Sequence, residues 1–228
     1  MNATKEKIEK LTTDGFELDF GTVFEQAFEN YKKIALYAGS VLLISTFLFL
    51  ILLFGLGIAV FGVGTLVDFF KPGNLTPETF TGDFLLIYTA VVVFITCLTS
   101  PFHAGFLKMA YCGDKGEEFN LSTMFIYYKP PFFMNIVGAT FLITALSTGI
   151  STLVDLAGVQ SIGIFTSLSI TFLTFLTIPL IVFGNLNAID GIKLSAQIIL
   201  KQPLLILALL IVSFLAALTG LMGFCIGI

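Results

Sequence analysis

The sequence has very little charge for its length. Charged residues make up 11% of its 228 residues and hydrophobic residues 57%, whereas a soluble domain carries about 25% charged residues. The mean hydropathy is +1.01. So few charges cannot cover a surface in water. The composition therefore excludes an ordinary soluble domain and predicts a chain that has lipid as its solvent.

Arginine and tryptophan are both absent. The 11 basic residues are all lysine, and with 15 acidic residues they give a net charge of -4. A nucleic-acid-binding protein needs a clustered basic face to replace counterions, so nucleic acid is excluded as a partner. Without tryptophan, the aromatic residues at a membrane interface must come from the 26 phenylalanines and six tyrosines.

Cysteine is scarce and widely spaced. Cys97, Cys112 and Cys225 form no Cys-x-x-Cys pair and have no neighbouring histidine. A disulfide framework or a zinc site would need paired or closer spacing. We therefore interpret the three side chains as small apolar fillers and expect neither a metal nor another cofactor.

Long uncharged runs predict an all-α, polytopic bundle with five visible spans and an incomplete sixth. Because a charged stretch precedes the first run, that run is expected to remain as a membrane anchor rather than act as a cleaved signal. The run from Ile34 to Val67 exceeds the roughly 20 residues of one span, so we expect a bent exit at its glycines. The other spans are expected at about 84–101 (its helix continuing to Tyr111), 131–154, 162–183 and 203–228.

The lysines predict the orientation. Ten of them fall before the first span or in the second-to-third and fourth-to-fifth connections, and Lys71 alone falls on the opposite side. Cytoplasmic loops carry the excess of lysine in membrane proteins. We therefore expect a multi-pass protein with a cytoplasmic N-terminus.

Internal repetition is visible in the ends and beginnings of the spans. Thr-x-Leu-Thr-x-Pro occurs at 96–101 and at 174–179, and a Lys-x-Pro pattern precedes the spans that begin near 131 and 203. Repetition of this kind indicates a common structural unit. We predict a polar tail at 1–19 and one transmembrane domain at 20–228, with units of amphipathic helix, span and span at about 20–111, 119–184 and 189–228.

Amphipathic stretches precede the odd-numbered spans. The first has an apolar stripe at helical spacing, which predicts a helix lying in the membrane interface. Its members are Phe20, Val23, Phe24, Phe28 and Tyr31. Thr22 and Glu25 fit a capping box at its start. The second stretch carries Leu121, Met124, Phe125 and Tyr128, and Asp190 is expected to cap the third.

The third unit contains only its first span. Residues 220–227 are rich in glycine and predict a turn followed by the opening of a sixth helix. We therefore expect either a shortened six-span design or another subunit that fills the gap. The expected partners are the lipid bilayer and a partner membrane subunit or a second copy of the chain.

The segment Asp19-Phe20-Gly21-Thr22-Val23-Phe24, the Thr-x-x-Pro span ends and the three-hairpin plan resemble a family of bacterial integral membrane proteins. These are similar to the membrane domain of glycerophosphodiester phosphodiesterase. The resemblance implies six helices in the bacterial cytoplasmic (inner) membrane. The catalytic barrel of that enzyme is absent from this chain, so no catalytic residue is carried over.

Hydroxyl side chains form the candidate polar path. Thr96, Thr99, Ser100 and His103 share one helical face and end in a titratable group near the cytoplasmic interface. Further hydroxyls line the third and fourth spans, among them Thr140, Thr144, Thr171 and Thr174. Alternatively, these groups bond to carbonyls freed by Pro101 and hold helices together.

No nucleophile–base pair, metal cluster or phosphate-binding loop is recognisable, so we expect no enzyme. The favoured hypothesis is a membrane scaffold or assembly protein whose amphipathic helices cover headgroups and bind partners. The alternative is a channel or transporter for a small solute or ion, with the serine and threonine residues along its path.

Overall fold

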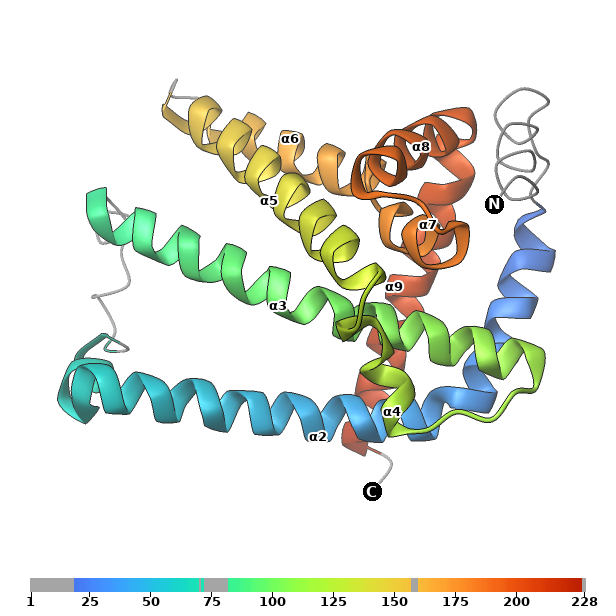
Figure 1. Ribbon diagram of the computed structural model, residues 1–228, viewed down its shortest axis with the longest axis horizontal. Helices are drawn as coiled ribbons and strands as arrows, with labels where there is room; N and C mark the ends of the chain where they lie inside the picture. Colours follow the sequence, from blue (N-terminus) through green and yellow to red (C-terminus); the bar gives the residue numbers. More distant parts are fainter. Residues whose placement is uncertain (1–18, 70, 72–81, 157–159, 227–228) are drawn as a thin grey trace.

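The computed structural model describes residues 19–69, 71, 82–156 and 160–226, and every regular element in these ranges is helical. Figure 1 shows their arrangement, which confirms the predicted all-helical class. The elements in chain order are α2 (Phe20–Phe69), α3 (Gly82–Lys115), α4 (Leu121–Met124), the 3-10 helix η2 (Ile126–Tyr128), α5 (Phe132–Leu156), α6 (Gln160–Leu173), α7 (Thr177–Gly184), α8 (Ala188–Lys201) and α9 (Pro203–Ile226).

Several helices are long and apolar enough to cross a membrane. Four such segments lie within the described residues, and they are Phe20–Ala59, Thr89–Lys115, Phe132–Val154 and Ile162–Gly184. The helices Ala188–Lys201 and Pro203–Leu218 pass the same test as a pair bent by 99°, which gives a fifth segment if the pair is one span. The grouping of these segments into repeated units stays a prediction.

Helix α2 contains both the predicted amphipathic stretch and the first span. Its dark-blue first part lies at an angle to the remainder (Figure 1). The predicted capping box of Thr22 and Glu25 is wrong, because Asp19 is the cap: its Oδ2 accepts from the backbone N–H of Thr22 at 2.7 Å. The helix therefore begins at Phe20 and includes Thr22 in its first turn. The expected break among the glycines falls at Gly62, which is not helical (φ 79°, ψ 155°).

The beginning of α8 differs from prediction by three residues. Asp190 is not the cap; the Asn187 Oδ1 accepts from the backbone N–H of Asp190 at 2.8 Å. The Asn187 amide also donates to the Asp190 carboxylate at 2.8 Å. Asparagine caps helices as well as aspartate does, and it comes first along the chain. Asp190 therefore lies in the first turn, where its charge still favours the helix N-terminus.

The turn predicted near the C-terminal end of the sequence is also wrong, because α9 is helical from Pro203 to Ile226. Each glycine inside a helix costs about 1 kcal/mol relative to alanine. An uncharged segment in lipid can satisfy its backbone groups only through helical hydrogen bonds, and leaving them unpaired costs more than the glycines do.

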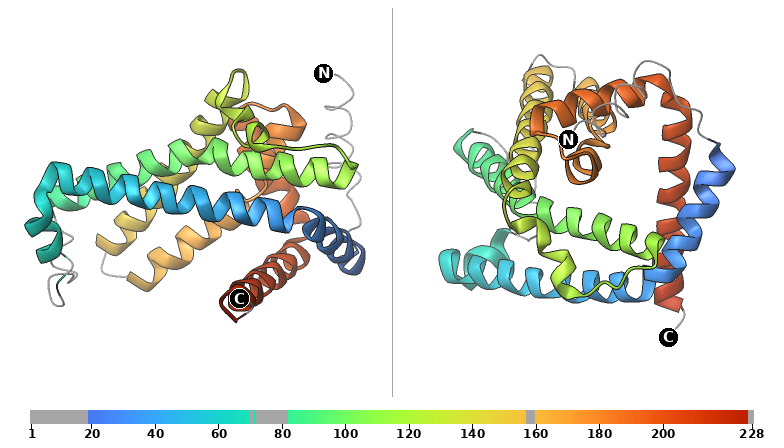
Figure 2. Two further views of the ribbon diagram at one scale, coloured as in Figure 1. Left: turned by 90° about the horizontal axis from the view of Figure 1, so that it is seen from below. Right: turned by 45° about the vertical axis from the view of Figure 1, so that its right-hand side comes forward.

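The best-buried part of the molecule lies where the second half of α3, the beginning of α5, α7 and α8 meet. Ala104, Ile136 and Ile181 are fully buried there, and Tyr127 and Val182 are nearly so. Helices α2 and α9 lie outside this core, and the first part of α2 runs beside α9 (Figure 2). The core therefore comes from the span ends predicted to face the cytoplasm.

Candidate functional site

The predicted hydroxyl stripe of α3 bonds to the backbone of its own helix. Thr96 is exposed and its hydroxyl donates to the Val92 carbonyl at 2.8 Å. Thr99 is half-buried and donates to the Ile95 carbonyl at 2.9 Å. Ser100 is buried, whereas His103 is exposed. The four residues share a helical face, but their side chains differ in solvent exposure: one is buried, one is half-buried and two are exposed.

Ser100 compensates for a hydrogen bond that Pro101 removes. Proline has no N–H, so the carbonyl four residues earlier, that of Cys97, loses its helical donor. The Ser100 hydroxyl donates to that carbonyl at 2.9 Å. From η2, the Tyr128 hydroxyl donates to the next carbonyl, that of Leu98, at 2.7 Å. Helix α3 therefore continues through Pro101 without a break.

Thr140 of α5 and Thr174, in the turn after α6, also bond to backbone carbonyls four residues earlier. Thr140 is buried and donates to the Ile136 carbonyl at 2.9 Å. Thr174 is half-buried and donates to the Ile170 carbonyl at 2.7 Å. Thr144 is half-buried and Thr171 is exposed. The hydroxyl oxygens of Ser147 and Ser167 lie 2.8 Å apart, and this contact joins α5 to α6.

The fourth predicted span is broken between α6 and α7, and Ser195 of α8 closes the break. Its hydroxyl donates to the Leu173 carbonyl at 2.8 Å and accepts from the Leu176 N–H at 3.1 Å. Ser195 is fully buried. One side chain thus pairs backbone groups on both sides of the break, where unpaired groups would be costly.

Sequence reasoning missed Ser195, although a signal was present. On the α8 helix, Ser195 falls on the face opposite Lys193, Gln197 and Lys201, together with Ala188, Ile192 and Ile199. A lone hydroxyl on an apolar face requires a hydrogen-bonding partner. That partner, however, lies 19 to 22 residues earlier in the chain.

Two glycines allow the short helices to approach the spans. A Cβ on Gly105 of α3 would overlap the backbone of Met124, whose Cα would lie at 2.6 Å. A Cβ on Gly191 of α8 would lie 3.0 Å from a side-chain carbon of Ile181. The α3–α4 contact is therefore made by main chain, and the α7–α8 contact by a side chain.

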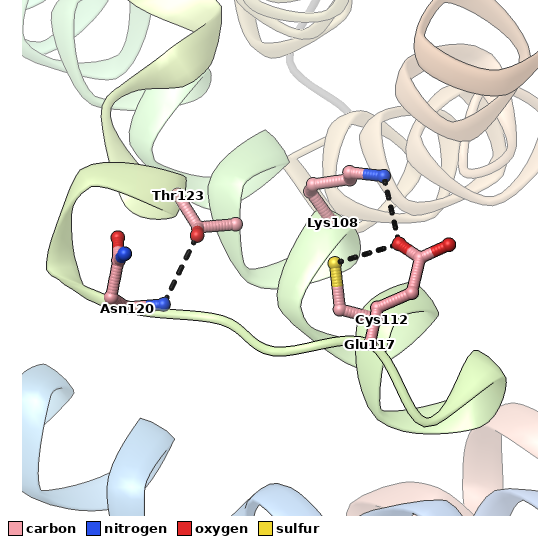
Figure 3. A network of polar contacts seen from close by, with 5 residues as sticks. All are labelled: Lys108, Cys112, Glu117, Asn120 and Thr123. Atoms are coloured by element: carbon pink, nitrogen blue, oxygen red, sulfur yellow. Dashed lines mark hydrogen bonds and ion pairs between the residues drawn. The ribbon is translucent and has the colours of Figure 1, made fainter.

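A polar network closes the loop after α3 (Figure 3). The Cys112 thiol donates to the Glu117 carboxylate at 3.6 Å, and the Lys108 ammonium lies 3.9 Å from the same oxygen. The Glu117 N–H donates to the Cys112 carbonyl at 2.8 Å. Lys108 also lies 4.5 Å from the centre of the Tyr111 ring. These contacts fix the loop that leads into α4.

Among the described residues, no three His, Cys, Asp or Glu side chains gather as a metal site would require. Glu117 is already engaged by a thiol and an ammonium group.

Burial, with a smaller contribution from Cys112, raises the pKa of the Tyr127 hydroxyl to about 12. That tyrosine is therefore protonated at neutral pH and serves as a packing group.

The predicted interfacial stripe on α2 is open to its surroundings. Phe20, Phe24, Phe28 and Tyr31 are 36%, 36%, 50% and 57% exposed, and Val23 is half-buried. Successive phenylalanine rings stack, with centres 6.1 and 6.2 Å apart. The three phenylalanine side chains therefore form a continuous aromatic surface along about two turns, and Tyr31 lies about one turn further on.

No protein-family model matches the chain, and no curated protein or solved structure is found to be similar to it. The resemblance to six-span bacterial membrane proteins therefore stays a prediction that rests on the short motifs quoted above.

Proposed function

We propose that the protein is a non-enzymatic scaffold or interaction protein of the bacterial cytoplasmic membrane, with its N-terminus in the cytoplasm. The observation that carries the proposal is the use of the hydroxyl groups: Ser100 and Ser195 each bond backbone groups at a proline-containing span end. Hydroxyl groups already bonded to the backbone are not free to bind a passing solute. These two side chains thus stabilise the span ends that we propose face the cytoplasm.

The surfaces of α2 and α9 are the proposed sites for protein partners. None of the most apolar window of Phe20–Ala59 is buried within the chain, and Leu36 is 87% exposed. On α9, Leu204 and Phe214 are 81% and 64% exposed. In a membrane these faces meet lipid, a partner subunit or a second copy. Crosslinking in native membranes from single cysteines at Leu36 or Phe214 would identify the neighbour.

A channel or transporter is the second candidate, and one observation favours it. The Thr177 hydroxyl at the break between α6 and α7 is fully buried, with no hydrogen-bond partner among the described residues. Broken helices with free polar groups form the ion and substrate sites of many transporters. In this protein Ser195 already pairs two of the backbone groups at the break, which favours the scaffold.

Flux into proteoliposomes separates the two candidates. For a scaffold, the wild type and the variants Thr177→Val and His103→Ala all leak at the rate of empty vesicles. Saturable uptake that is lost in Thr177→Val would overturn the scaffold in favour of transport.

The orientation of the chain in the membrane has a separate test. An amine-labelling reagent added outside the cell membrane should react with Lys71 and not with Lys115.

A further inference from the structure

Helix α2 is too long for its first part to lie within the membrane span that the same helix forms. The helical segment Phe20–Ala59 has 40 residues, which at 1.5 Å per residue is about 60 Å. The hydrocarbon core of a bilayer is only about 30 Å thick. Glu25, Glu29, Lys32 and Lys33 all lie in the first part. That part therefore lies outside the hydrocarbon but remains attached to it by an unbroken backbone.

Contacts with α3 fix which way this part of α2 faces. The Asn30 amide donates to the Ala110 carbonyl at 2.7 Å, and the Lys33 ammonium lies 3.5 Å from the Gly113 carbonyl. Ile34 packs against Gly113 so closely that a Cβ there would lie 2.6 Å from it. Phe24 and Asn30 are six residues apart and point in directions roughly 120° apart around the helix. The aromatic stripe therefore faces away from α3.

The charges on this part do not favour an anionic surface. Within residues 20–33, Glu25 and Glu29 carry two negative charges and Lys32 and Lys33 carry two positive ones, and Asp19 directly before them adds a third negative charge. Lys32 pairs with Glu29, and Lys33 caps the end of α3. Attraction to anionic lipid needs lysines in excess and free to reach the headgroups. Any binding to the membrane surface must therefore come from the aromatic rings.

We propose that residues 20–33 form an interfacial anchor whose stripe, Phe20, Phe24, Phe28 and Tyr31, binds the boundary between headgroups and acyl chains without preference for anionic lipid. The inference rests on the proposed membrane location and deepens it by naming the lipid surface. It is independent of whether the protein is a scaffold or a transporter. Helix α8 behaves differently, because the protein itself covers Leu194 and Ile199.

The absence of tryptophan from the sequence allows a direct test. The full-length Phe24→Trp variant is reconstituted in phosphatidylcholine vesicles that carry bromine at a shallow or a deep acyl position. We expect blue-shifted emission and at least twofold stronger quenching by the shallow bromine. Addition of phosphatidylglycerol should leave the quenching unchanged. Phe28→Trp is the second probe, in case Phe24→Trp perturbs folding.

Two matched controls calibrate the depth. Leu43→Trp lies in the span, and its fluorescence should be quenched more by the deep bromine. Glu118→Trp lies in the exposed turn after α3 and should escape quenching. Water-like emission of both stripe probes would overturn the proposal. Blue-shifted emission without lipid quenching would show that protein covers the stripe, and quenching that requires phosphatidylglycerol would refute the charge argument. Flux measurements on the same vesicles test the scaffold separately.

Discussion

Pro101 and Pro179 occupy the same place in two copies of Thr-x-Leu-Thr-x-Pro, but the helices around them differ. Helix α3 runs through Pro101, whereas the corresponding span is broken into α6 and α7 just before Pro179. The residue before each proline also differs. Ser100 bonds the carbonyl that Pro101 frees, but its counterpart Ile178 has no hydroxyl. In the second copy, backbone groups at the break are paired by Ser195 of another helix.

Pro179 lies in the first turn of α7, where its missing N–H costs little, and Ser195 pairs Leu173 and Leu176 rather than a group freed by that proline. The comparison therefore concerns how each span end is held: by a donor of the same helix or by a donor of a neighbouring helix. A local donor preserves a continuous helix. A donor on a neighbouring helix lets the span break and makes the break depend on tertiary structure. The span end at Pro101 should therefore depend less on contacts with other helices than the break before Pro179 does.

The largest expected effect is at the glycine contacts. Gly105→Ala places a Cβ against the Met124 backbone, which cannot rotate away, so we expect a loss of about 3 kcal/mol in the free energy of unfolding. Gly191→Ala meets side-chain carbons of Ile181 at 3.0 Å and Thr177 at 3.5 Å, which need to shift by only a few tenths of an ångström, and should cost about 1 kcal/mol. Denaturant unfolding in detergent measures both. Equal losses would contradict the distinction, and Gly149→Ala, which meets nothing within 4 Å, is the neutral control.

The next effect is at the break itself. Ser195→Ala leaves the Leu173 carbonyl and the Leu176 N–H without their partner, and we expect a loss of about 2 kcal/mol. Hydrogen exchange should increase at 174–178 before it increases in α5. Ser169→Ala is the matched control, because that exposed serine bonds only within its own helix. Unchanged exchange at the break would show that Ser195 does not hold it.

A smaller effect is expected at the continuous end. Ser100→Ala removes the donor to one carbonyl and should cost about 1 kcal/mol, because Tyr128 still holds the neighbouring carbonyl. Tyr128→Phe should have a similar cost, and the double variant should lose more than the sum of the two. If Ser100→Ala lost more free energy of unfolding than Ser195→Ala, the proposal that the end at Pro101 depends less on other helices would be contradicted.

The smallest expected effect is on the pH dependence of stability. It is absent at neutral pH and appears only at high pH, at the span end that contains Pro101. That end packs against Tyr127, whose pKa burial raises from 10.0 to about 12. The folded state thus favours the protonated form, and the resulting stability is complete below pH 10 and lost as the pH rises towards 12. Unfolding midpoints should fall across this interval in the wild type and fall less in Tyr127→Phe. Identical pH profiles would contradict this assignment.

The sequence predicted the long helices well, because runs without charge have few alternatives in lipid. It predicted the caps less well: Asp19 replaced Thr22 and Asn187 replaced Asp190, since neighbouring polar residues compete for the same role. The hydroxyl residues of the predicted path lie in helices except Thr174, which lies in the turn between α6 and α7. The sequence could not indicate what they bond, because a threonine or serine reaches its own carbonyls and those of a neighbour with similar ease.

The break between α6 and α7 also has a consequence for the order of biosynthesis. Leu173 and Leu176 leave the ribosome before Ser195 does, so this span enters the membrane with two backbone groups still waiting for their partner. The segment can settle only after α8 has been translated and has folded back. Released chains truncated before residue 188 should therefore hold this hairpin loosely, and the full chain should hold it firmly.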